Sequence, residues 1–451
     1  MPATTQSPSA STAATAAPID IVILSNGPGE VATWVKPVVR SLKTKALQNQ
    51  QTARISVILS PCPHASGQEP IALQKYPEVD RVQSAPNFFK FLLTGKTADS
   101  WDWHQQGVVV FLGGDQLYTV IAAKHLGYRT VTYAEWDARW PGMVDSFGVM
   151  QADLVQAAPA RYQPKFKVVG DLMADVQSSA DRAEITTALG CAPKTTLVGL
   201  LPGSKPVKLS IGMPMMLSIA VDLHAQYGQS IQVVLGVAPN LTLPGLMQYT
   251  DPAYNTAIAT FPCPPVTLIE PNEGLPYLQL GADRDGPDRD GPKIVLWQRF
   301  PALDLFSQCG LCFTTVGANT AQLGSLGTPM IVLLPTQTLG AITFADGLAG
   351  LLSRLPGVGA IARRIINPIL VSALQKSGKR FAWPNIWAKR EVVPELFGPI
   401  TATDASNVAK NFLNNPEKLD AIRQDLRQLR GPAGAADKMA DLILETVNYP
   451  K

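Results

Sequence analysis

Short, nearly continuous apolar runs that end in glycine-rich turns recur along the chain. The first run covers residues 19–25 (IDIVILS), and a turn at residues 26–30 and apolar residues at helical spacing follow it. Such a run predicts a parallel strand that is covered on both faces of its sheet. Further strands are expected at residues 54–60, 107–112, 128–133, 145–155, 166–169, 195–201, 231–236, 310–315 and 330–334. The repeated strand–helix pattern predicts an α/β protein with doubly wound domains.

The chain has 451 residues, of which 46% are hydrophobic, and this is enough for two domains with separate cores. We expect a first domain over residues 19–180, a second over residues 190–430 and a C-terminal helix within residues 431–451. Residues 1–18 lack both a cationic start and an apolar run, which predicts a disordered tail rather than a signal peptide. No uninterrupted apolar stretch of about 18 residues is present, so no transmembrane helix is expected.

Charge and cysteine content exclude several classes of protein. The formal net charge is +3, so no basic field over the whole chain argues for a nucleic-acid partner. Five scattered cysteines suit a reducing compartment better than a disulfide framework. Cys309 and Cys312 form a C-x-x-C pair, but no second pair exists to complete a zinc site. The four histidines are far apart in sequence, and we therefore expect no metal centre.

Residues 381–398 (FAWPNIWAKREVVPELFG) combine aromatic, cationic and carboxylate side chains in one short span. Pro384 and Asn385 form a turn signal, because proline fixes φ and asparagine tolerates unusual backbone angles. Pro394 is suited to the first turn of a helix, where Glu395 would complement the positive end of the helix dipole. The span therefore indicates either a site for a polar, polyphosphorylated ligand or a surface loop that leads into a helix.

Within this span, PNIWAKREVVPEL resembles the PNI-x-A-x-R-x-x-x-PEL signature of the lipid A disaccharide synthases. Those enzymes are GT-B glycosyltransferases, which move sugars of the N-acetylglucosamine type from a UDP donor to a lipid-linked acceptor. The resemblance implies two facing Rossmann-like domains with the active site in the cleft, and a C-terminal helix that returns to the first domain. It also implies that Asn385, Arg390, Glu391 and Glu395 bind the nucleotide sugar.

Residues 202–205 (PGSK) resemble the first donor loop of this family, a PGSR turn that follows a strand. Gly203, Ser204 and Lys205 would present amides, a hydroxyl and a cation to the phosphates of the donor. Lysine stands here where arginine is usual, so a point charge replaces a bidentate fork.

Residues 316–322 (VGANTAQ) resemble the second donor loop, a turn into a helix that we expect at residues 321–326. The N-terminus of a helix attracts anions. Gln322 takes the place of a glutamate that commonly holds a ribose in GT-B enzymes, and it can still form hydrogen bonds without charge. The residues expected to bind the nucleotide sugar here are Gly317, Asn319, Thr320 and Gln322.

The first domain supplies the residues that are expected on the acceptor side. Gly29 and Glu30 lie in the glycine turn after the first strand, where the family has a Gly-Glu-rich turn near the acceptor. Asp115 follows a strand and two glycines, and a carboxylate there can act as a general base or can cap a helix. The resemblance assigns the role of base to Asp115. Trp136 and Arg139 lie in residues 133–140 (YAEWDARW), which can grip a sugar or cover a hydrophobic edge.

Two segments depart from the strand–helix pattern. Residues 283–292 form a tandem repeat, DRDGPDRDGP, which predicts a solvated and mobile insert near residues 280–293. Residues 347–380 carry lysine and arginine among apolar clusters, without any Asp or Glu. Such a basic, amphipathic segment indicates contact with an anionic membrane surface, or an ordinary helix pair whose cations are solvated.

The resemblance and the residues together predict a metal-independent glycosyltransferase that needs no cofactor besides its UDP-sugar donor. The sugar would be of the N-acetylglucosamine type, and the expected partners are the UDP-sugar, a lipid or lipid-linked acceptor and an anionic membrane surface. The expected location is the cytoplasm, peripherally on the cytoplasmic face of the membrane. Two alternatives stay open: a UDP-sugar 2-epimerase, which shares the GT-B plan, and a catalytically silent protein that binds a nucleotide sugar or lipid. The changes at Lys205, Ala318 and Gln322 favour the silent protein.

Overall fold

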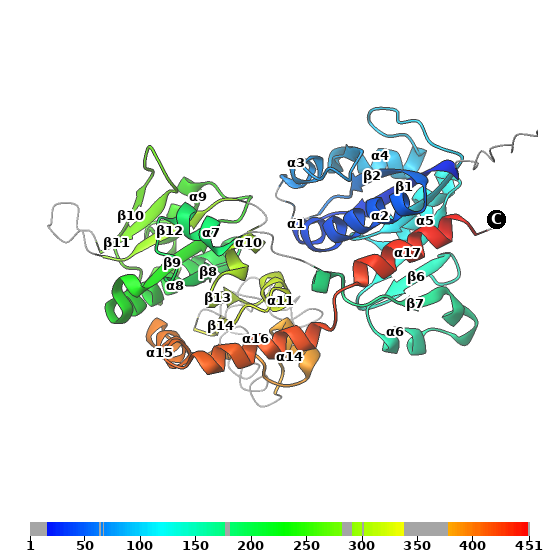
Figure 1. The fold of residues 1–451 in the computed structure, drawn as a ribbon. Helices are drawn as coiled ribbons and strands as arrows, with labels where there is room; N and C mark the ends of the chain where they lie inside the picture. Colours follow the sequence, from blue (N-terminus) through cyan, green and yellow to red (C-terminus); the bar gives the residue numbers. More distant parts are fainter. Residues whose placement is uncertain are drawn as a thin grey trace, which may run out of the picture. The chain divides into compact units, whose positions relative to one another are not determined.

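The computed structural model describes residues 16–62, 65, 67–175, 181–281, 291–299, 302–337 and 378–449. The chain divides into two compact units: unit 1 comprises residues 1–175 and 433–451, and unit 2 comprises residues 176–432. Each unit contains one sheet with helices against it (Figure 1). The last helix of the chain therefore belongs to the same unit as the first strands.

Unit 1 is built on a seven-stranded sheet with the order β3-β2-β1-β4-β5-β6-β7, in which all neighbouring strands are parallel. Its strands are β1 (Ala16–Ser25), β2 (Gln51–Leu59), β3 (Arg81–Gln83), β4 (Gln106–Phe111), β5 (Arg129–Ala134), β6 (Ser146–Val149) and β7 (Phe166–Val168). The strand order reverses at β1, which pairs with β2 on one side and β4 on the other. Ligands of open α/β sheets bind beyond the carboxyl ends of the strands at such a switch point. The turns after β1 and β4 therefore lie where the fold favours a site.

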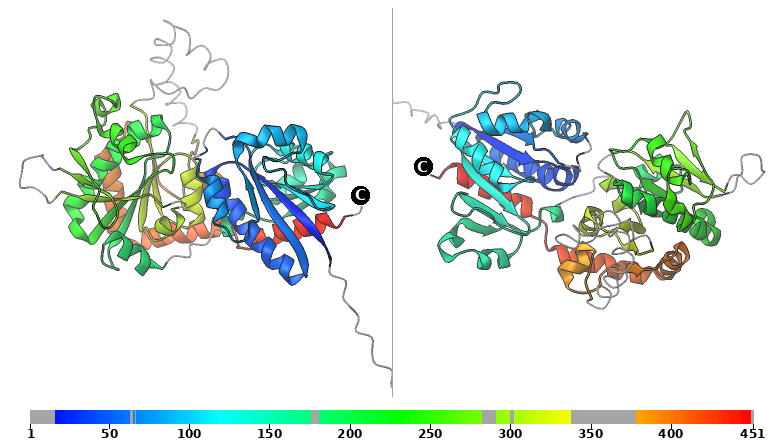
Figure 2. Two further views of the ribbon diagram at one scale, coloured as in Figure 1. Left: turned by 90° about the horizontal axis from the view of Figure 1, so that it is seen from above. Right: turned by 180° about the vertical axis from the view of Figure 1, so that it is seen from behind.

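Helices cover both faces of this sheet. One face packs against α2 (Lys36–Gln48) and α17 (Ala435–Val447), and the other packs against α4 (Phe88–Thr94) and α5 (Gln116–Leu126). Figure 2 shows α2 in blue and α17 in red on the same side of the sheet. The other helices of this unit are α1 (Pro28–Glu30), η1 (Val31–Val35), α3 (Glu69–Gln74), η2 (Ala85–Asn87), α6 (Ala152–Ala157), η3 (Ala160–Lys165) and η4 (Leu172–Asp175).

Polar contacts hold α17 to unit 1. The Asp175 carboxylate accepts hydrogen bonds from the backbone N–H groups of Gly434 and Ala436. This places a negative charge at the positive end of the helix dipole. Further along, Lys45 of α2 forms an ion pair of 2.7 Å with Asp441. The resemblance implied that the C-terminal helix returns to the first domain, and the structure places it there.

Unit 2 is built on an eight-stranded sheet with the order β10-β11-β12-β9-β8-β13-β14-β15. Its strands are β8 (Thr196–Leu201), β9 (Ile231–Gly236), β10 (Val266–Ile269), β11 (Tyr277–Leu280), β12 (Lys293–Trp297), β13 (Leu311–Thr315), β14 (Met330–Pro335) and β15 (Glu395–Gly398). The strands from β12 to β15 run parallel, whereas β10 and β11 add an antiparallel edge. The order reverses at β8, so the favoured place for a ligand is beyond β8 and β13.

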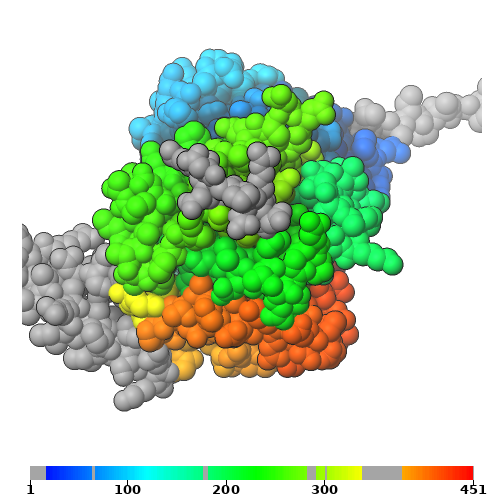
Figure 3. Space-filling model, turned by 90° about the vertical axis from the view of Figure 1, so that its left-hand side faces the viewer, coloured from blue at the N-terminus to red at the C-terminus, as the bar shows by residue number. Residues whose placement is uncertain are grey.

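The helices of unit 2 also form two layers. The core on one face contains residues of α8 (Pro206–Tyr227) and α15 (Ala402–Leu413), and the core on the other contains residues of α7 (Arg182–Leu189) and α16 (Pro416–Arg430). Figure 3 shows α15 and α16 in orange, directly against the green residues of the same unit. The other helices are α9 (Leu243–Met247), α10 (Leu303–Ser307), α11 (Ala318–Ser325) and α14 (Trp383–Ala388), with the short η5 (Gly228–Ser230), η6 (Gln248–Thr250) and η7 (Thr256–Ala259).

One described helix, α8 with the turn that follows it, is long and apolar enough to cross a membrane by length and composition. Its residues Leu209, Met213, Met216 and Leu223 are nevertheless buried in the core of unit 2. Composition alone cannot separate a core helix from a membrane helix, and the packing of α8 is that of a core helix.

Three expected elements have different bounds or a different type. Glu395 begins strand β15 rather than a helix, because Pro394 needs no N–H before a strand, and its carbonyl accepts a hydrogen bond from Val332. The expected strand at residues 145–155 is β6 followed by helix α6, since Gln151 stands at the N-cap and ends the strand pairing. The sequence predicts a helix over residues 213–227, and α8 starts earlier, at Pro206, a residue that suits the first turn of a helix.

Several expectations fall partly outside the described residues. The proposed tail overlaps β1, which begins at Ala16, and residues 1–15 are not described. Most of the insert at residues 280–293 and most of the basic segment at residues 347–380 also lie outside the described residues. Their predicted roles stay predictions.

Candidate functional site

Three turns of unit 1 meet at the switch point of its sheet. Gly113 and Gly114 follow β4 with φ values of 128° and 101°. A Cβ on Gly113 would lie 2.8 Å from the Oδ1 atom of Asn26, and a Cβ on Gly114 would lie 2.8 Å from the Oγ atom of Ser60. Both positions therefore require glycine, and the turns after β1, β2 and β4 approach one another closely.

Gly29 and Glu30 lie in the first of these turns, where the helical segment α1, η1 and α2 begins. The Thr33 hydroxyl donates a hydrogen bond of 2.9 Å to the carbonyl of Gly29. A Cβ on Gly113 would lie 3.2 Å from Glu30 Cβ, so Glu30 packs beside the Gly113–Gly114 turn. The π-helical turn η1 immediately follows, and such turns occur frequently at functional sites.

Asp115 is the N-cap of α5. Its Oδ1 atom accepts a hydrogen bond of 2.8 Å from the backbone N–H of Leu117. The second carboxylate oxygen, Oδ2, has no hydrogen-bond partner in the part of the chain that the structure describes. The two roles that the sequence left open are thus compatible: one oxygen caps the helix, and the other is available for an acceptor hydroxyl. The role of base stays a prediction.

Gln116 joins the expected acceptor residues to Asp115, and the sequence analysis did not identify it. Its Nε2 atom donates to the carbonyl of Asp137 at 2.9 Å, and its Oε1 atom accepts from the N–H of Arg139 at 2.8 Å. The loop that carries Trp136 and Arg139 is therefore held beside the start of α5. The Trp136 side chain is 48% exposed, as a residue that stacks on a ligand would be.

An ion pair also forms within the loop that carries Trp136 and Arg139. The Arg139 guanidinium forms an ion pair of 2.6 Å with the carboxylate of Asp137, and both side chains are more than half exposed. The hydrogen bond to Asp137 raises the pKa of Arg139, and the field of Asp115 adds to this effect. Gly29, Glu30, Asp115, Trp136 and Arg139 thus lie around the carboxyl ends of β1, β4 and β5.

The first donor loop of unit 2 connects β8 to α8. Gly203 has a φ of 101°, which favours glycine. Ser204 and Lys205 are exposed, and the side-chain amide of Asn240 donates to the carbonyl of Ser204 at 3.4 Å. Lys205 stands at the N-cap of α8 without capping it through its side chain.

The second donor loop connects β13 to α11. Gly317 is the N-cap of α11 with a φ of 141°. The Thr320 hydroxyl is fully buried, where it donates to the Gly317 carbonyl at 2.8 Å and accepts from the N–H of Trp383 at 3.2 Å. Thr320 therefore shapes the turn, and its expected contact with the nucleotide sugar stays a prediction. Asn319 and Gln322 are partly buried and form no side-chain hydrogen bond with the described residues.

Lys208, in the first turn of α8, lies between the two donor loops, and the sequence analysis did not identify it. Its Nζ atom donates a hydrogen bond of 2.6 Å to the carbonyl of Val316 in the second loop. Burial, with a further contribution from the charge of Lys205, lowers the pKa of Lys208. The signal that could have found it is a second lysine three residues after Lys205, close enough on the first turn to face the same side.

Asn385 is fully buried in the span that resembles the family signature, and its side chain is saturated with hydrogen bonds. Its Oδ1 atom accepts from the N–H groups of Val392 and Val393 at 2.7 and 2.9 Å. Its Nδ2 atom donates to the Val393 carbonyl at 2.8 Å and to the Glu395 carboxylate at 2.7 Å. In this arrangement the Asn385 side chain has a structural role, and its expected contact with the nucleotide sugar stays a prediction.

Glu395 completes this internal network. Besides Asn385, its carboxylate accepts hydrogen bonds from the backbone N–H groups of Phe381 and Ala382. The hydrogen bonds of Glu395 therefore connect the start of the span with its end. Arg390 and Glu391 are exposed, and Arg390 pairs with Asp425 of α16 at 3.0 Å. The span contacts α11 through the hydrogen bond from the Trp383 N–H to the Thr320 hydroxyl.

Replacing Asn385 by alanine is expected to destabilise unit 2 by roughly 2 kcal/mol or more, because it leaves the buried N–H groups of Val392 and Val393 without their acceptor and removes one donor to the Glu395 carboxylate. Chemical denaturation followed by circular dichroism measures the change. The matched control is Asn414→Ala, which removes an exposed amide that accepts one hydrogen bond from Tyr227. Similar stability losses in the two variants would show that the network around Asn385 contributes little.

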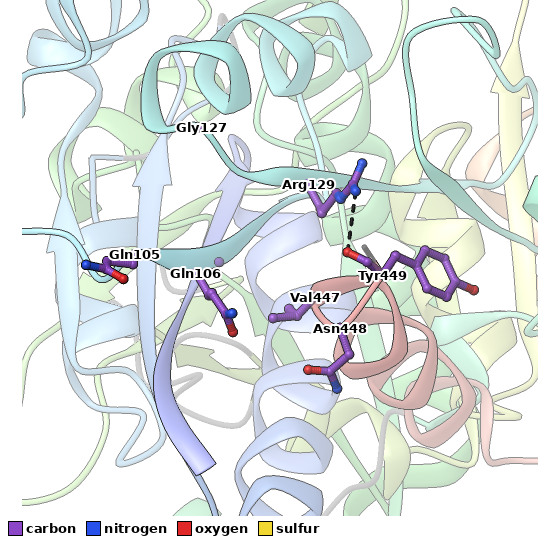
Figure 4. A pocket seen from close by; sticks show the side chains of 8 residues that line it. Gln105, Gln106, Gly127, Arg129, Val447, Asn448 and Tyr449 are labelled. Atoms are coloured by element: carbon purple, nitrogen blue, oxygen red, sulfur yellow. Dashed lines mark hydrogen bonds between the residues drawn. The ribbon is translucent and has the colours of Figure 1, made fainter. Parts of the chain in front are cut away.

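The described residues have two further features that bear on a site. No group of three or more His, Cys, Asp or Glu within them could hold a metal ion. A hollow of about 420 Å³ lies at the amino ends of β4 and β5, where Arg129 donates to the Tyr449 carbonyl at 3.4 Å (Figure 4). Its lining residues are Gln105, Gln106, Gly107, Gly127, Arg129, Val447, Asn448 and Tyr449. It therefore lies at the opposite edge of the sheet from Asp115.

Comparison with known proteins gives one similar curated sequence and several similar structures. No family model matches the chain. A lipid-A-disaccharide synthase of Geobacter metallireducens is 24% identical over 282 residues, which cover 61% of this chain and 56% of that protein. The alignment thus spans little more than half the length of the relative.

The chain is therefore similar in sequence to a lipid-A-disaccharide synthase over part of its length. Its fold is also that of a protein from Listeria monocytogenes assigned as a UDP-N-acetylglucosamine 2-epimerase, with a TM-score of 0.53, 13% identity and coverage of 97% of this chain and 99% of that one. A second UDP-N-acetylglucosamine 2-epimerase structure gives a TM-score of 0.51 at 12% identity, with coverage of 97% and 98%. The expected α/β fold of GT-B type with two domains is confirmed.

Proposed function

We propose that the protein is a glycosyltransferase that moves a sugar of the N-acetylglucosamine type from a UDP-sugar to a lipid or lipid-linked acceptor. The observation that carries the proposal is the arrangement of two glycine turns around a cationic side chain at the carboxyl ends of β8 and β13. Such turns suit the phosphates of a nucleotide donor. The sequence similarity to a lipid-A-disaccharide synthase supports the same chemistry.

In this proposal the donor occupies the loops of unit 2. Backbone amides near Ser204 and Gly317 receive the diphosphate oxygens, and polar side chains near these two loops complete the binding. Charge that develops on the UDP leaving group is offset by the start of α11 and by lysine rather than by a metal ion. Neither a metal nor a further cofactor is required.

Asp115 of unit 1 acts as general base in the same proposal. The acceptor hydroxyl gives its proton to the Oδ2 atom, its oxygen forms a bond to the anomeric carbon, and the bond from that carbon to the β-phosphate oxygen breaks with its electron pair leaving on UDP. Trp136 and Arg139 bind the acceptor beside Asp115, on the loop that Gln116 holds. A lipid acceptor places the protein peripherally on the cytoplasmic face of a membrane.

The experiment that tests this function measures UDP release from a panel of UDP-sugars, with and without a membrane lipid extract. The expected result is release from one donor that depends on the lipid. UDP binding without release on any acceptor would instead indicate a silent binding protein.

A UDP-sugar 2-epimerase is the second candidate, because two structures that share the fold are described as UDP-N-acetylglucosamine 2-epimerases. Such an enzyme would invert the C2 centre of a free UDP-sugar and would need no lipid. Product analysis by NMR on UDP-N-acetylglucosamine without lipid separates the two functions: a C2 epimer favours the epimerase, and unchanged substrate favours the transferase.

A further inference from the structure

Lys208 is placed by the fold between two loops that are far apart in sequence. Its Cα belongs to the first turn of α8, after the first donor loop, and its Nζ atom reaches the Val316 carbonyl of the second loop at 2.6 Å. The side chain is only partly exposed, whereas Lys205 at the helix N-cap is exposed. Lys208 is therefore the cation that both loops share.

Both loops leave room for this side chain. A Cβ on Gly203 would lie 3.0 Å from Lys208 Cδ, and a Cβ on Gly317 would lie 2.7 Å from Lys208 Nζ. At the second distance the ammonium would have to move, because real Cβ atoms essentially never approach so closely. The Lys208 side chain thus occupies space that depends on a glycine in each loop, Gly203 in the first and Gly317 in the second.

The charge of Lys208 is not compensated within the described residues. Its ammonium group has three donors, of which one is used by Val316, and no ion pair with a carboxylate is found for it in the described ranges. Burial, with a further contribution from the positive charge of Lys205, lowers the pKa of Lys208. A half-buried cation without a counter-ion is a costly arrangement unless an anion occupies the site.

The neighbouring groups also match an anion. The Thr315 hydroxyl is buried and has no hydrogen-bond partner among the described residues, and a Cβ on Gly203 would lie 3.4 Å from it. The start of α11 at Gly317 contributes free N–H groups and the positive end of a helix dipole. Three different elements thus contribute to one candidate anion site, through Lys208, Thr315 and the start of α11.

We propose that Lys208, rather than Lys205, is the cation that holds the diphosphate of the donor nucleotide. This assignment rests on the proposed function for the identity of the ligand, but the anion site itself follows from the residues described above. The two remaining donors of the ammonium group bind phosphate oxygens, and Val316 keeps the side chain in place. Lys205, exposed at the N-cap, contributes only a screened surface charge.

The test compares Lys208→Met with Lys205→Met in the full-length protein, with UDP, uridine and inorganic pyrophosphate as probes. Lys208→Met is expected to lower the affinities for UDP and pyrophosphate by about 10- to 100-fold, since it removes hydrogen bonds to a charged group. Its affinity for uridine, which has no phosphate, should stay the same. Lys205→Met should lower the affinity for UDP by less than about threefold.

Thermal unfolding separates a binding role from a structural one. Methionine has a similar length and removes an uncompensated charge, so Lys208→Met without ligand is expected to melt at the same temperature as the wild type or higher. A variant that melts far below the wild type, or does not fold, would overturn the proposal, because Lys208 would then be a structural residue. Equal affinities of Lys208→Met and the wild type for pyrophosphate would also overturn it.

The probes distinguish failure of this inference from failure of the proposed function. Binding of pyrophosphate that depends on Lys208, without binding of UDP, would support the anion site and reject the UDP-sugar donor. Binding of UDP that is insensitive to Lys208→Met would reject the assignment of Lys208 and leave the donor in place. A wild-type protein that binds neither probe would overturn the anion site itself.

Discussion

Asp115→Asn is expected to lower turnover by about 100- to 10,000-fold while donor affinity changes little, because the change removes only the proton acceptor. Asparagine is as good an N-cap as aspartate, so its side-chain oxygen can still accept from the N–H of Leu117 and hold α5 in place. UDP release measures turnover, and calorimetric titration with the donor measures binding. Full activity in this variant would remove Asp115 as the base.

Asp181→Asn is the matched control for this experiment. Asp181 caps α7 in unit 2 in the same way, with its Oδ1 atom accepting from the N–H of Ala183 at 3.3 Å. It lies on no loop that we assign to the site, so its replacement is expected to leave turnover unchanged. If both variants lost activity equally, the loss would reflect helix capping rather than proton transfer.

Asp20→Asn is expected to destabilise unit 1 by about 3–5 kcal/mol, the range for breaking a buried ion pair. Asp20 is fully buried in β1. Its carboxylate accepts hydrogen bonds from Arg54 at 2.7 and 3.1 Å, from the Tyr128 hydroxyl at 2.8 Å and from the N–H of His104 at 2.6 Å, and Arg81 lies 3.7 Å away. Asparagine would leave these cations without a buried counter-ion.

Denaturation in urea, followed by tryptophan fluorescence, measures this loss. The rings of Trp101 and Trp103 lie 4.6 and 4.9 Å from the Arg81 guanidinium and therefore report on the network. The control is Asp102→Asn, since the Asp102 side chain pairs with the same arginines but is 80% exposed. Its effect should stay within about 1 kcal/mol. If Asp20→Asn and Asp102→Asn lost equal amounts of unfolding free energy, burial of the Asp20 carboxylate would not explain the loss.

The Asp20 carboxylate also makes the stability of unit 1 depend on pH. Burial alone would raise the pKa of Asp20, but the hydrogen bonds from Arg54, His104 and Tyr128 outweigh burial and lower the pKa below its ordinary value of 3.8. As the pH falls, the Asp20 carboxylate therefore binds a proton in the unfolded state at a higher pH than in the folded state. The stabilisation by Asp20 is fully present above the ordinary pKa and is lost as the pH falls through the lowered pKa of the folded state. The wild type should lose more unfolding free energy than Asp20→Asn below about pH 4.

The strands and the turns that follow them were predictable from the sequence. The expected strand at residues 231–236 coincides with β9 (Ile231–Gly236), and the one at residues 107–112 differs from β4 (Gln106–Phe111) by one residue at each end. A strand that is buried on both faces needs a continuous apolar run, and a tight turn after it needs glycine. Both are local properties, so the donor loops and the Asp115 turn were located without the structure.

The sequence could not show which side chains of these segments face a ligand. Asn385 and Glu395 are polar and lie in the most distinctive stretch of the chain, yet their hydrogen bonds close that stretch on itself. Lys208 was indistinguishable from a solvated helix residue until the fold placed it against a second loop. Exposure and hydrogen-bond saturation depend on neighbours that a local pattern does not specify.

The sequence by itself thus determined the α/β class, the resemblance to GT-B glycosyltransferases and the turns where chemistry is expected, because these follow from short-range patterns. Only the tertiary structure decided the strand order and the contact between Lys208 and Val316. Those features join residues that are distant along the chain, 108 positions apart for Lys208 and Val316. They therefore depend on how the whole of each unit packs.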